Sequence, residues 1–157
     1  MKNIKFINGV AIKVLVRHKD ERGYFEELIR VSDDFFQEGF GQLSHSVMYP
    51  GVIKAWHVHK TQTDWWFVAR GDLKVVLYDT RKNSSTYKNT NEFVLGQHGD
   101  NFILKIPPEV AHGCKVIGAV TELVYVTSAP YDQSEEGRIP HDDPSIGYNW
   151  LKIAPIK

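Results

Sequence analysis

The stretch from Gly51 to Gly71 reads GVIKAWHVHKTQTDWWFVARG and decides the fold. Apolar and aromatic residues surround His57 and His59, which stand two positions apart. Because successive side chains of a β-strand point to opposite faces, this spacing predicts that both imidazoles lie on one face of a strand. The polar run after His59 predicts a turn, and Asp64 opens the returning strand, where its carboxylate can meet the two histidines. Gly71 then predicts another turn.

Short β-rich segments continue on both sides of this stretch, separated by turn residues. The expected strands are Val10–Val16, Val52–His59, Trp65–Arg70, Leu73–Asp79, Glu92–Leu95, Asn101–Ile106 and Thr121–Thr127. One short helix is expected around Asp33–Gln37, with Ser32 as its cap. Many short strands without alternating helices indicate a sandwich or barrel and argue against an α/β fold. We therefore expect an all-β protein.

The composition is that of one globular domain. The chain has 157 residues, of which 42% are hydrophobic and 24% charged. We expect residues 1–157 to form a single domain, with a wrapping tail over residues 131–157. Lys plus Arg equals Asp plus Glu at 19 each. This balance provides no overall field that would favour nucleic acid or a membrane as a partner.

The cysteine content and the chain start both favour the cytoplasm. Cys114 is the single cysteine, so no intramolecular disulfide can form and a reducing compartment fits best. The first residues are basic, but no apolar run of signal-peptide length follows them. No stretch approaches the length of a membrane span. We therefore predict a cytoplasmic protein.

The spacing of residues 51–71 matches the first motif of the cupin family, G-x5-H-x-H-x4-E-x6-G, with Asp64 in place of Glu. The second cupin motif, Pro–x–Gly–x–x–His, is similar to PPEVAH at 107–112, where Glu109 replaces Gly. The resemblance implies a cupin, a double-stranded β-helix or jelly-roll barrel. Three imidazoles and one carboxylate would suit Zn, Mn, Fe or Ni. The residues that would form this metal set are His57, His59, Asp64 and His112.

Three segments resemble the dTDP-4-dehydrorhamnose 3,5-epimerase family of nucleotide-sugar enzymes. They are DERGYF at 20–25, PPEVAHG at 107–113 and HDDPSIGYNW at 141–150. This resemblance covers nearly the whole chain. It implies a 3- or 3,5-epimerase or isomerase of a nucleotide-linked 4-keto-6-deoxy sugar, serving deoxysugar and polysaccharide biosynthesis. It also implies a homodimer, with the amino-terminal strands in residues 1–50 in dimer contact. The homodimer would bind a nucleotide-diphosphate sugar and need no cofactor.

The same resemblance implies which residues act. His57 would be the general base, Tyr125 the general acid, and His112 a further residue of the catalytic pocket. A ketone acidifies the hydrogens on neighbouring ring carbons, so a neutral imidazole can remove one and a tyrosine can return a proton from the other side. Some substrate contacts would come across the dimer. The implied substrate-binding residues are Arg22, Tyr24, Glu27, Gln42, Lys54 and Tyr131.

The chain also departs from the family's pattern. Lys54 stands in place of an arginine, Val75 in place of an interior aspartate, and Asp64 in place of the active-site lysine. In the family an aspartate beyond the position of Trp150 orients the base. We expect that aspartate to be missing here, because the sequence ends soon after Trp150. Asp64 could then serve as the partner of His57.

Two other interpretations remain open beside the epimerase. The set of three histidines and one aspartate favours a metal-dependent cupin enzyme, an oxygenase or a metal-assisted isomerase, in which a divalent ion polarises a carbonyl. Loss of the orienting carboxylate favours a non-catalytic sugar-binding cupin. The role of Tyr125 is open as well, since alternation along its strand could bury it as a core aromatic.

Overall fold

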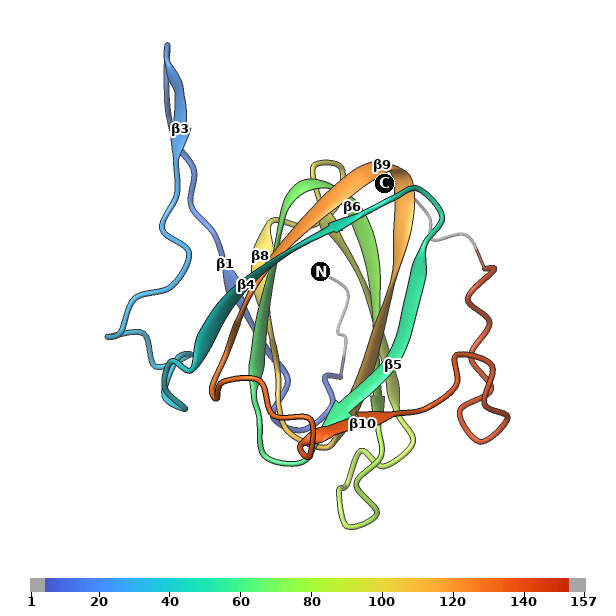
Figure 1. Cartoon of the computed structure of the whole chain (residues 1–157). Coiled ribbons are helices and arrows are strands. Elements are labelled where there is room, and N and C mark those ends of the chain that lie inside the picture. The colour runs from blue at the N-terminus through green and yellow to red at the C-terminus, as the bar shows by residue number, and fades with distance from the viewer. Residues whose placement is uncertain (1–4, 153–157) are drawn as a thin grey trace.

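The computed structural model describes residues 5–152, and every regular element in that range is a β-strand. No helix there is long and apolar enough to cross a membrane. Figure 1 shows the strands wrapped around a common interior. The strands are β1 (Ala11–Val14), β2 (His18–Asp20), β3 (Gly23–Phe25), β4 (Gln42–Met48), β5 (Ile53–His59), β6 (Asp64–Asp79), β7 (Thr90–Gly96), β8 (Phe102–Ile106), β9 (Val110–Thr127) and β10 (Glu136–Arg138).

The long strands β6 and β9 organise the barrel, because they pair antiparallel along almost their whole lengths. The first half of β6 belongs to a layer in the order β1-β8-β6-β9-β4. Its second half belongs to a layer in the order β7-β6-β9-β5-β10. The register of β6 against β9 shifts between Val68 and Asp72, where one layer passes into the other. The expected all-β jelly-roll barrel is confirmed.

Gly71 lies at this passage between layers, where β6 continues and bends instead of ending in a turn. Its φ is +76°, and a Cβ there would lie 2.6 Å from both the Val120 carbonyl oxygen and Thr121 Oγ1. A residue with a side chain would therefore suffer both backbone strain and a steric clash. The expected segments Trp65–Arg70 and Leu73–Asp79 are thus two halves of one strand.

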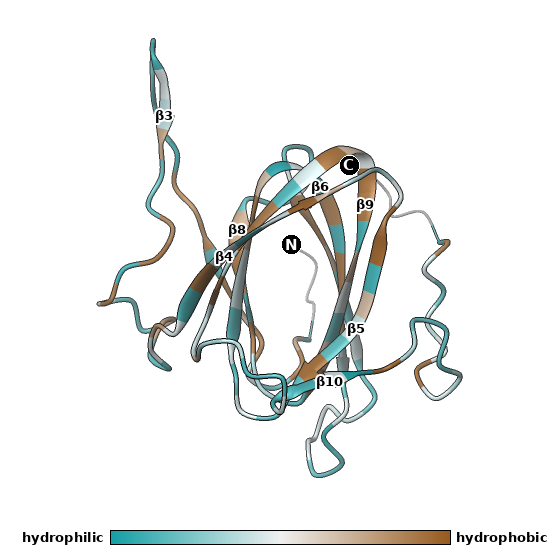
Figure 2. Cartoon of the chain, in the orientation of Figure 1, coloured by the Kyte–Doolittle hydropathy of each residue, from teal (hydrophilic) through white to brown (hydrophobic). Residues whose placement is uncertain are grey.

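Alternating apolar side chains fill the space between the two layers. Leu73, Val75 and Leu77 of β6 are completely buried, and Leu95 and Leu104 pack in the same cluster. Figure 2 shows the corresponding alternation of hydrophobic and hydrophilic residues along the barrel strands. Val75, which stands where the family carries an aspartate, is therefore a core residue.

The expected helix at Asp33–Gln37 is wrong, because the segment forms turns. The Phe36 N–H donates to the Asp33 carbonyl oxygen over 2.8 Å, and the Asp33 carboxylate accepts from Lys13 Nζ over 2.6 Å. The Phe36 ring packs against Trp65 with 4.5 Å between ring centroids. A helix this short forms too few hydrogen bonds to offset the unfavourable free energy of its nucleation, so these tertiary contacts decide the conformation.

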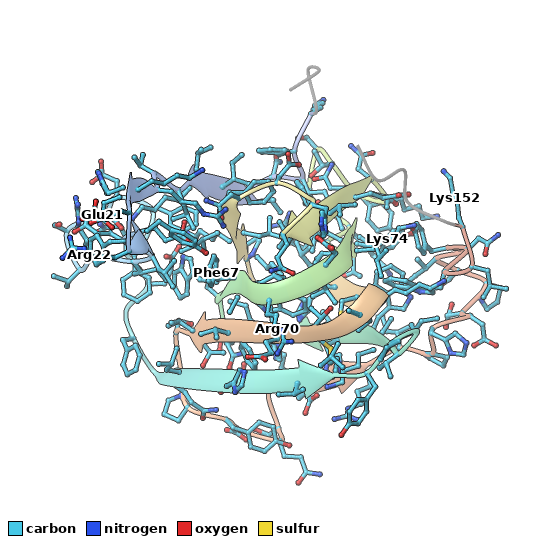
Figure 3. All side chains as sticks on the ribbon, turned by 90° about the horizontal axis from the view of Figure 1, so that it is seen from above. Glu21, Arg22, Phe67, Arg70, Lys74 and Lys152 are labelled. Carbon is cyan, nitrogen blue, oxygen red and sulfur yellow. The ribbon has the colours of Figure 1, made fainter. Side chains whose placement is uncertain are left out.

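The hairpin of β2 and β3 projects away from the barrel (Figure 1). Glu21 and Arg22 lie at its outer end (Figure 3). Tyr24 and Phe25 are 55% and 64% exposed, which is unusual for large aromatic side chains. The Arg17 guanidinium lies 4.5 Å from the centroid of the Tyr24 ring. The hairpin therefore presents aromatic surface that the barrel of its own chain does not cover.

Residues 131–152 run along the barrel and are attached to it at several points. Strand β10 pairs with β5, with Arg138 opposite His57. Trp150 is buried against Trp56, with 4.9 Å between ring centroids. Lys74, buried in β6, donates to the carbonyl oxygen of Lys152 over 3.2 Å, and both residues lie on the same side of the molecule (Figure 3).

Asp79 at the end of β6 organises the loop that follows. Its side chain is fully buried and accepts hydrogen bonds from Arg81 Nε at 2.8 Å, Ser84 Oγ at 2.7 Å and Thr86 Oγ1 at 2.6 Å. Burial alone would raise the pKa of Asp79, but the hydrogen bonds from Arg81, Thr86 and Ser84 outweigh it and lower the pKa well below its usual value.

We expect Asp79→Asn to lower the free energy of unfolding by about 3 kcal/mol or more, because it leaves the Arg81 charge without its buried partner. Since the pKa of Asp79 is depressed in the folded state, its contribution is present above the pKa of the unfolded chain and is lost as the pH falls below that value. Urea denaturation at pH 7 and at a pH well below 3.8, the ordinary pKa of this carboxyl, measures both effects. Equal losses at the two pH values would contradict the ionic part of this assignment.

Candidate functional site

A cavity of about 300 Å³ opens into the barrel between the two layers. This volume is within the range of small-molecule sites. Apolar side chains such as Met48 and Leu123 line it together with polar and titratable groups. The expected pocket residues that the structure brings together here are Gln42, Lys54, His57, His112, Tyr125 and Tyr131.

His57 on β5 and His112 on β9 are direct cross-strand partners. Their rings are stacked, with centroids 6.1 Å apart and 20° between the planes. The register between β5 and β9 is irregular between Lys54 and His57. Because of this irregularity, Lys54 and His57 both line the cavity, although residues an odd number of positions apart on a regular strand point to opposite faces. The predicted convergence of the two histidines inside the barrel is confirmed.

His57 has a carboxylate partner that the sequence did not reveal. Its Nδ1 lies 2.8 Å from Glu136 Oε1, so the Nδ1–H donates to the carboxylate. Glu136 Oε1 also accepts from Arg138 Nη2 over 3.1 Å. Because β10 pairs with β5, Glu136 is held close to His57 across 79 positions of sequence. The proton is thereby placed on Nδ1, and Nε2 is left with a free lone pair.

Burial lowers the pKa of His57 below its ordinary value, and the hydrogen bond that His57 donates to Glu136 opposes this only in part. Burial would raise the pKa of Glu136, but the bond to His57 and the charge of Arg138 outweigh it and lower the pKa. At neutral pH the pair is therefore a neutral imidazole beside an ionised carboxylate. This is the state that a general base requires, because the carboxylate also stabilises the imidazolium that forms.

The expectation that Asp64 would serve as the partner of His57 is wrong. Asp64 Oδ2 lies 3.9 Å from His59 Nε2 and 3.9 Å from His112 Nε2. Asp64 is 3% exposed. Of the four residues expected to hold a metal, His59, Asp64 and His112 therefore form one cluster, while His57 is engaged by Glu136. Strand β10 instead brings the carboxylate of Glu136 to Nδ1 of His57.

Tyr125 lines the cavity from β9, and its ring lies 6.4 Å from that of Trp66. It stands opposite Trp66 on β6 and Ser44 on β4. This part of β9 belongs to the first layer, whereas His57 belongs to the second. The two side chains therefore enter the same cavity from different layers, as an acid and a base acting on opposite sides of one ring would require.

Gln42 and Tyr131 are joined at the cavity wall, where the Tyr131 N–H donates to Gln42 Oε1 over 3.1 Å. The other expected substrate-binding residues are not near this cavity in the same chain. Arg22 bonds to Asp20 at the end of the projecting hairpin, and its side chain is 82% exposed. Tyr24 lies on the same hairpin, and Glu27 forms an ion pair with Arg30.

Cys114 lines the cavity but is unsuited to act as a nucleophile. Burial raises the pKa of its thiol to about 12, so the thiolate is scarcely populated at neutral pH. Its Sγ lies 3.9 Å from the sulfur of Met48. The interpretation of Cys114 as a small apolar residue fits this environment.

Comparisons with known proteins find similar sequences and a similar fold. The family model described as dTDP-4-dehydrorhamnose 3,5-epimerase matches residues 5–157. The chain is 47% identical over 148 residues to the spore coat polysaccharide biosynthesis protein SpsL of Bacillus subtilis, covering 92% of this chain and 96% of that protein. It is 34% identical over 148 residues to the probable low-salt glycan biosynthesis epimerase Agl13 of Haloferax volcanii, covering 92% and 94%.

A similar solved structure is the crystal structure of a dTDP sugar isomerase from Desulfovibrio desulfuricans. It superposes with a TM-score of 0.88 at 30% sequence identity and covers 96% of this chain and 95% of its own. The match extends over almost the whole barrel, the tail included.

Proposed function

Because this chain belongs to the dTDP-4-dehydrorhamnose 3,5-epimerase family, we propose that it is an epimerase of a nucleotide-linked 4-keto-6-deoxy sugar. His57 removes a hydrogen from a ring carbon beside the ketone, and the carbon is reprotonated from the opposite side. The observation that carries the proposal is the 2.8 Å contact between His57 Nδ1 and Glu136 Oε1 inside the cavity. It supplies a neutral, oriented base at neutral pH.

The proton transfers need no cofactor. Nε2 of His57 accepts the proton, and the charge that develops on the imidazole is stabilised by Glu136. Tyr125 returns a proton to the other face of the sugar. Lys54 and Arg138 both line the cavity and supply positive charge for the diphosphate. The product serves polysaccharide or glycoside assembly, in keeping with the names of the relatives.

The active form on this proposal is a homodimer. Tyr24 and Phe25 expose their rings on the projecting hairpin, and Leu43 and Val47 of β4 are 60% and 52% exposed. Burying such surface against a second copy would remove large apolar side chains from water. The hairpin of one copy would then carry Arg22 to the cavity of the other. Sedimentation of the full chain and of Phe25→Glu, which should favour the monomer, tests this pairing.

Incubation with a dTDP-4-keto-6-deoxyhexose in deuterated water tests the reaction directly. Exchange of a ring hydrogen beside the ketone, followed by NMR, is the expected result. No exchange, combined with retained binding of the nucleotide sugar, would contradict the epimerase. It would leave the non-catalytic sugar-binding cupin as the interpretation of this chain.

We expect Tyr125→Phe to lower formation of the inverted product by about a hundredfold, because the ring remains and the transferable proton is lost. Exchange of the ring hydrogen should persist, since His57 can return deuterium to the face from which it took the proton. NMR of the recovered substrate distinguishes exchange from inversion. Unchanged product formation would show that Tyr125 is a wall residue of the cavity and not the acid.

A further inference from the structure

His59, Asp64 and His112 meet at the buried end of the cavity from three different strands. Within residues 5–152 they form the one group of three or more His, Cys, Asp or Glu side chains with ligand atoms this close, all within 4.8 Å of one another. Both Nε2 atoms face the same oxygen, Oδ2 of Asp64, at 3.9 Å. His112 and Asp64 are 2% and 3% exposed, so bulk water has little access to them.

The two separations of 3.9 Å are too long for hydrogen bonds. Tetrahedral metal–ligand bonds of about 2.0–2.2 Å place neighbouring ligand atoms roughly 3.3 to 3.6 Å apart, so each histidine needs to approach Asp64 by only a few tenths of an ångström to share an ion with it. The three side chains are therefore close to the spacing of a coordination site with its centre between them.

The hydrogen bonds around the cluster determine which atoms face its centre. The Nδ1–H of His112 donates to the Val110 carbonyl oxygen over 3.0 Å, which leaves Nε2 as a bare lone pair directed at Asp64. A lone pair facing a buried carboxylate at this distance is unfavourable unless a cation lies between them. Metal-binding histidines usually have this second contact to a backbone carbonyl, because it fixes the tautomer.

The carboxylate of Asp64 is oriented by two hydrogen bonds from neighbouring side chains. Its Oδ1 accepts from Gln62 Nε2 over 2.7 Å, and its Oδ2 accepts from Trp66 Nε1 over 3.1 Å. Both donors are neutral, so they orient the carboxylate without cancelling its charge. The buried negative charge therefore remains available to a cation on the side of the two histidines.

We infer that His59, Asp64 and His112 bind one divalent transition-metal ion, such as Zn²⁺, Mn²⁺, Fe²⁺ or Ni²⁺, in the sugar cavity. Two imidazoles and one carboxylate suit these ions and leave coordination positions open toward the cavity. When bound, the ion would act as a Lewis acid toward a ligand oxygen. His57 stays outside the set, because the ligand atoms that all lie within 4.8 Å of one another belong to His59, Asp64 and His112. The ion site and the base are thus separate parts of one cavity.

Co²⁺ titration of untagged, chelator-treated protein tests the inference without any substrate. We expect one equivalent to bind, with visible ligand-field absorption and a rise in Tm. Zn²⁺ added afterwards should displace the Co²⁺ and bleach the absorption. Elemental analysis of protein purified without chelator should show up to one metal ion for each chain.

His59→Ala and Asp64→Asn should each weaken Co²⁺ binding by more than about a hundredfold. Loss of a residue that only hydrogen-bonds to a metal ligand already lowers metal affinity by about tenfold to a hundredfold. His98→Ala is the matched control, because His98 is 70% exposed, contacts Asp72 and does not line the cavity. Wild-type protein that binds no Co²⁺, or binding that His59→Ala leaves unchanged, would overturn the inference. Far-ultraviolet circular dichroism confirms that each variant is folded.

The metal inference does not rest on the proposed epimerase. Co²⁺ binding is measured on the protein alone, so the ion site can be present whether or not ring-hydrogen exchange occurs. Ring-hydrogen exchange by chelator-treated protein with no metal would support the epimerase and leave the ion site to be judged by the titration.

Discussion

His57→Asn is expected to lower the rate of ring-hydrogen exchange by about 10²–10⁴-fold or more, the contribution of a positioned general base. Asparagine is polar and of similar size, but its amide does not accept a proton at neutral pH. Binding of the nucleotide sugar should change little, because His57 acts on the reacting carbon. Exchange in deuterated water, followed by NMR, measures the rate, and calorimetry measures the affinity for substrate.

His98→Ala serves as the control for loss of a histidine, because it removes an exposed imidazole outside the cavity. It should exchange at the wild-type rate. If His57→Asn kept wild-type exchange, the base would be another group and the proposed role of His57 would fail. If His57→Asn lost both exchange and binding, His57 would be a binding residue.

Glu136→Gln should lower the exchange rate by up to about 10⁴-fold, the effect seen when the orienting carboxylate of a catalytic histidine becomes an amide. The amide can donate to His57 Nδ1, which would move the ring proton to Nε2 and remove the lone pair that faces the substrate. The replacement is isosteric, so KM should change little while kcat falls. Steady-state kinetics separates the two parameters.

Glu136→Asp is the companion variant, because it keeps the charge and withdraws it by one methylene. It should retain more activity than Glu136→Gln. Nitrogen-15 NMR of the histidine rings reports the tautomer, and His57 should carry its proton on Nδ1 in wild type and on Nε2 in Glu136→Gln. A fall in kcat without a change of tautomer would show that Glu136 acts through the fold and not through the orientation of His57.

Glu136 changes the interpretation of the site. The resemblance to the family suggested that the base would lack an orienting carboxylate or would use Asp64. The contact from β10 supplies that carboxylate independently of what lies beyond Trp150. Asp64 is thereby left to face His59 and His112. One cavity can therefore contain an oriented base and a separate cluster of metal-ligating groups.

The local pattern around His57 and His59 was sufficient to predict their common face and the all-β barrel. A period of two along a strand depends only on backbone geometry, so it can be read without knowing what the strand packs against. The convergence of His57 and His112 followed from two motifs in order. The prediction of a helix at 33–37 was wrong because this segment has only a weak local preference for a helix. Its contacts with Lys13 and Trp65 outweigh that preference.

Sequence by itself thus determined the fold class, the face that carries the histidines and several of the polar residues that line the cavity. Only the tertiary structure decided which carboxylate belongs to which histidine. Glu136 is separated from His57 by 79 positions, and its approach depends on the pairing of β10 with β5. Such pairing is set by the packing of the tail against the barrel, which no local periodicity encodes.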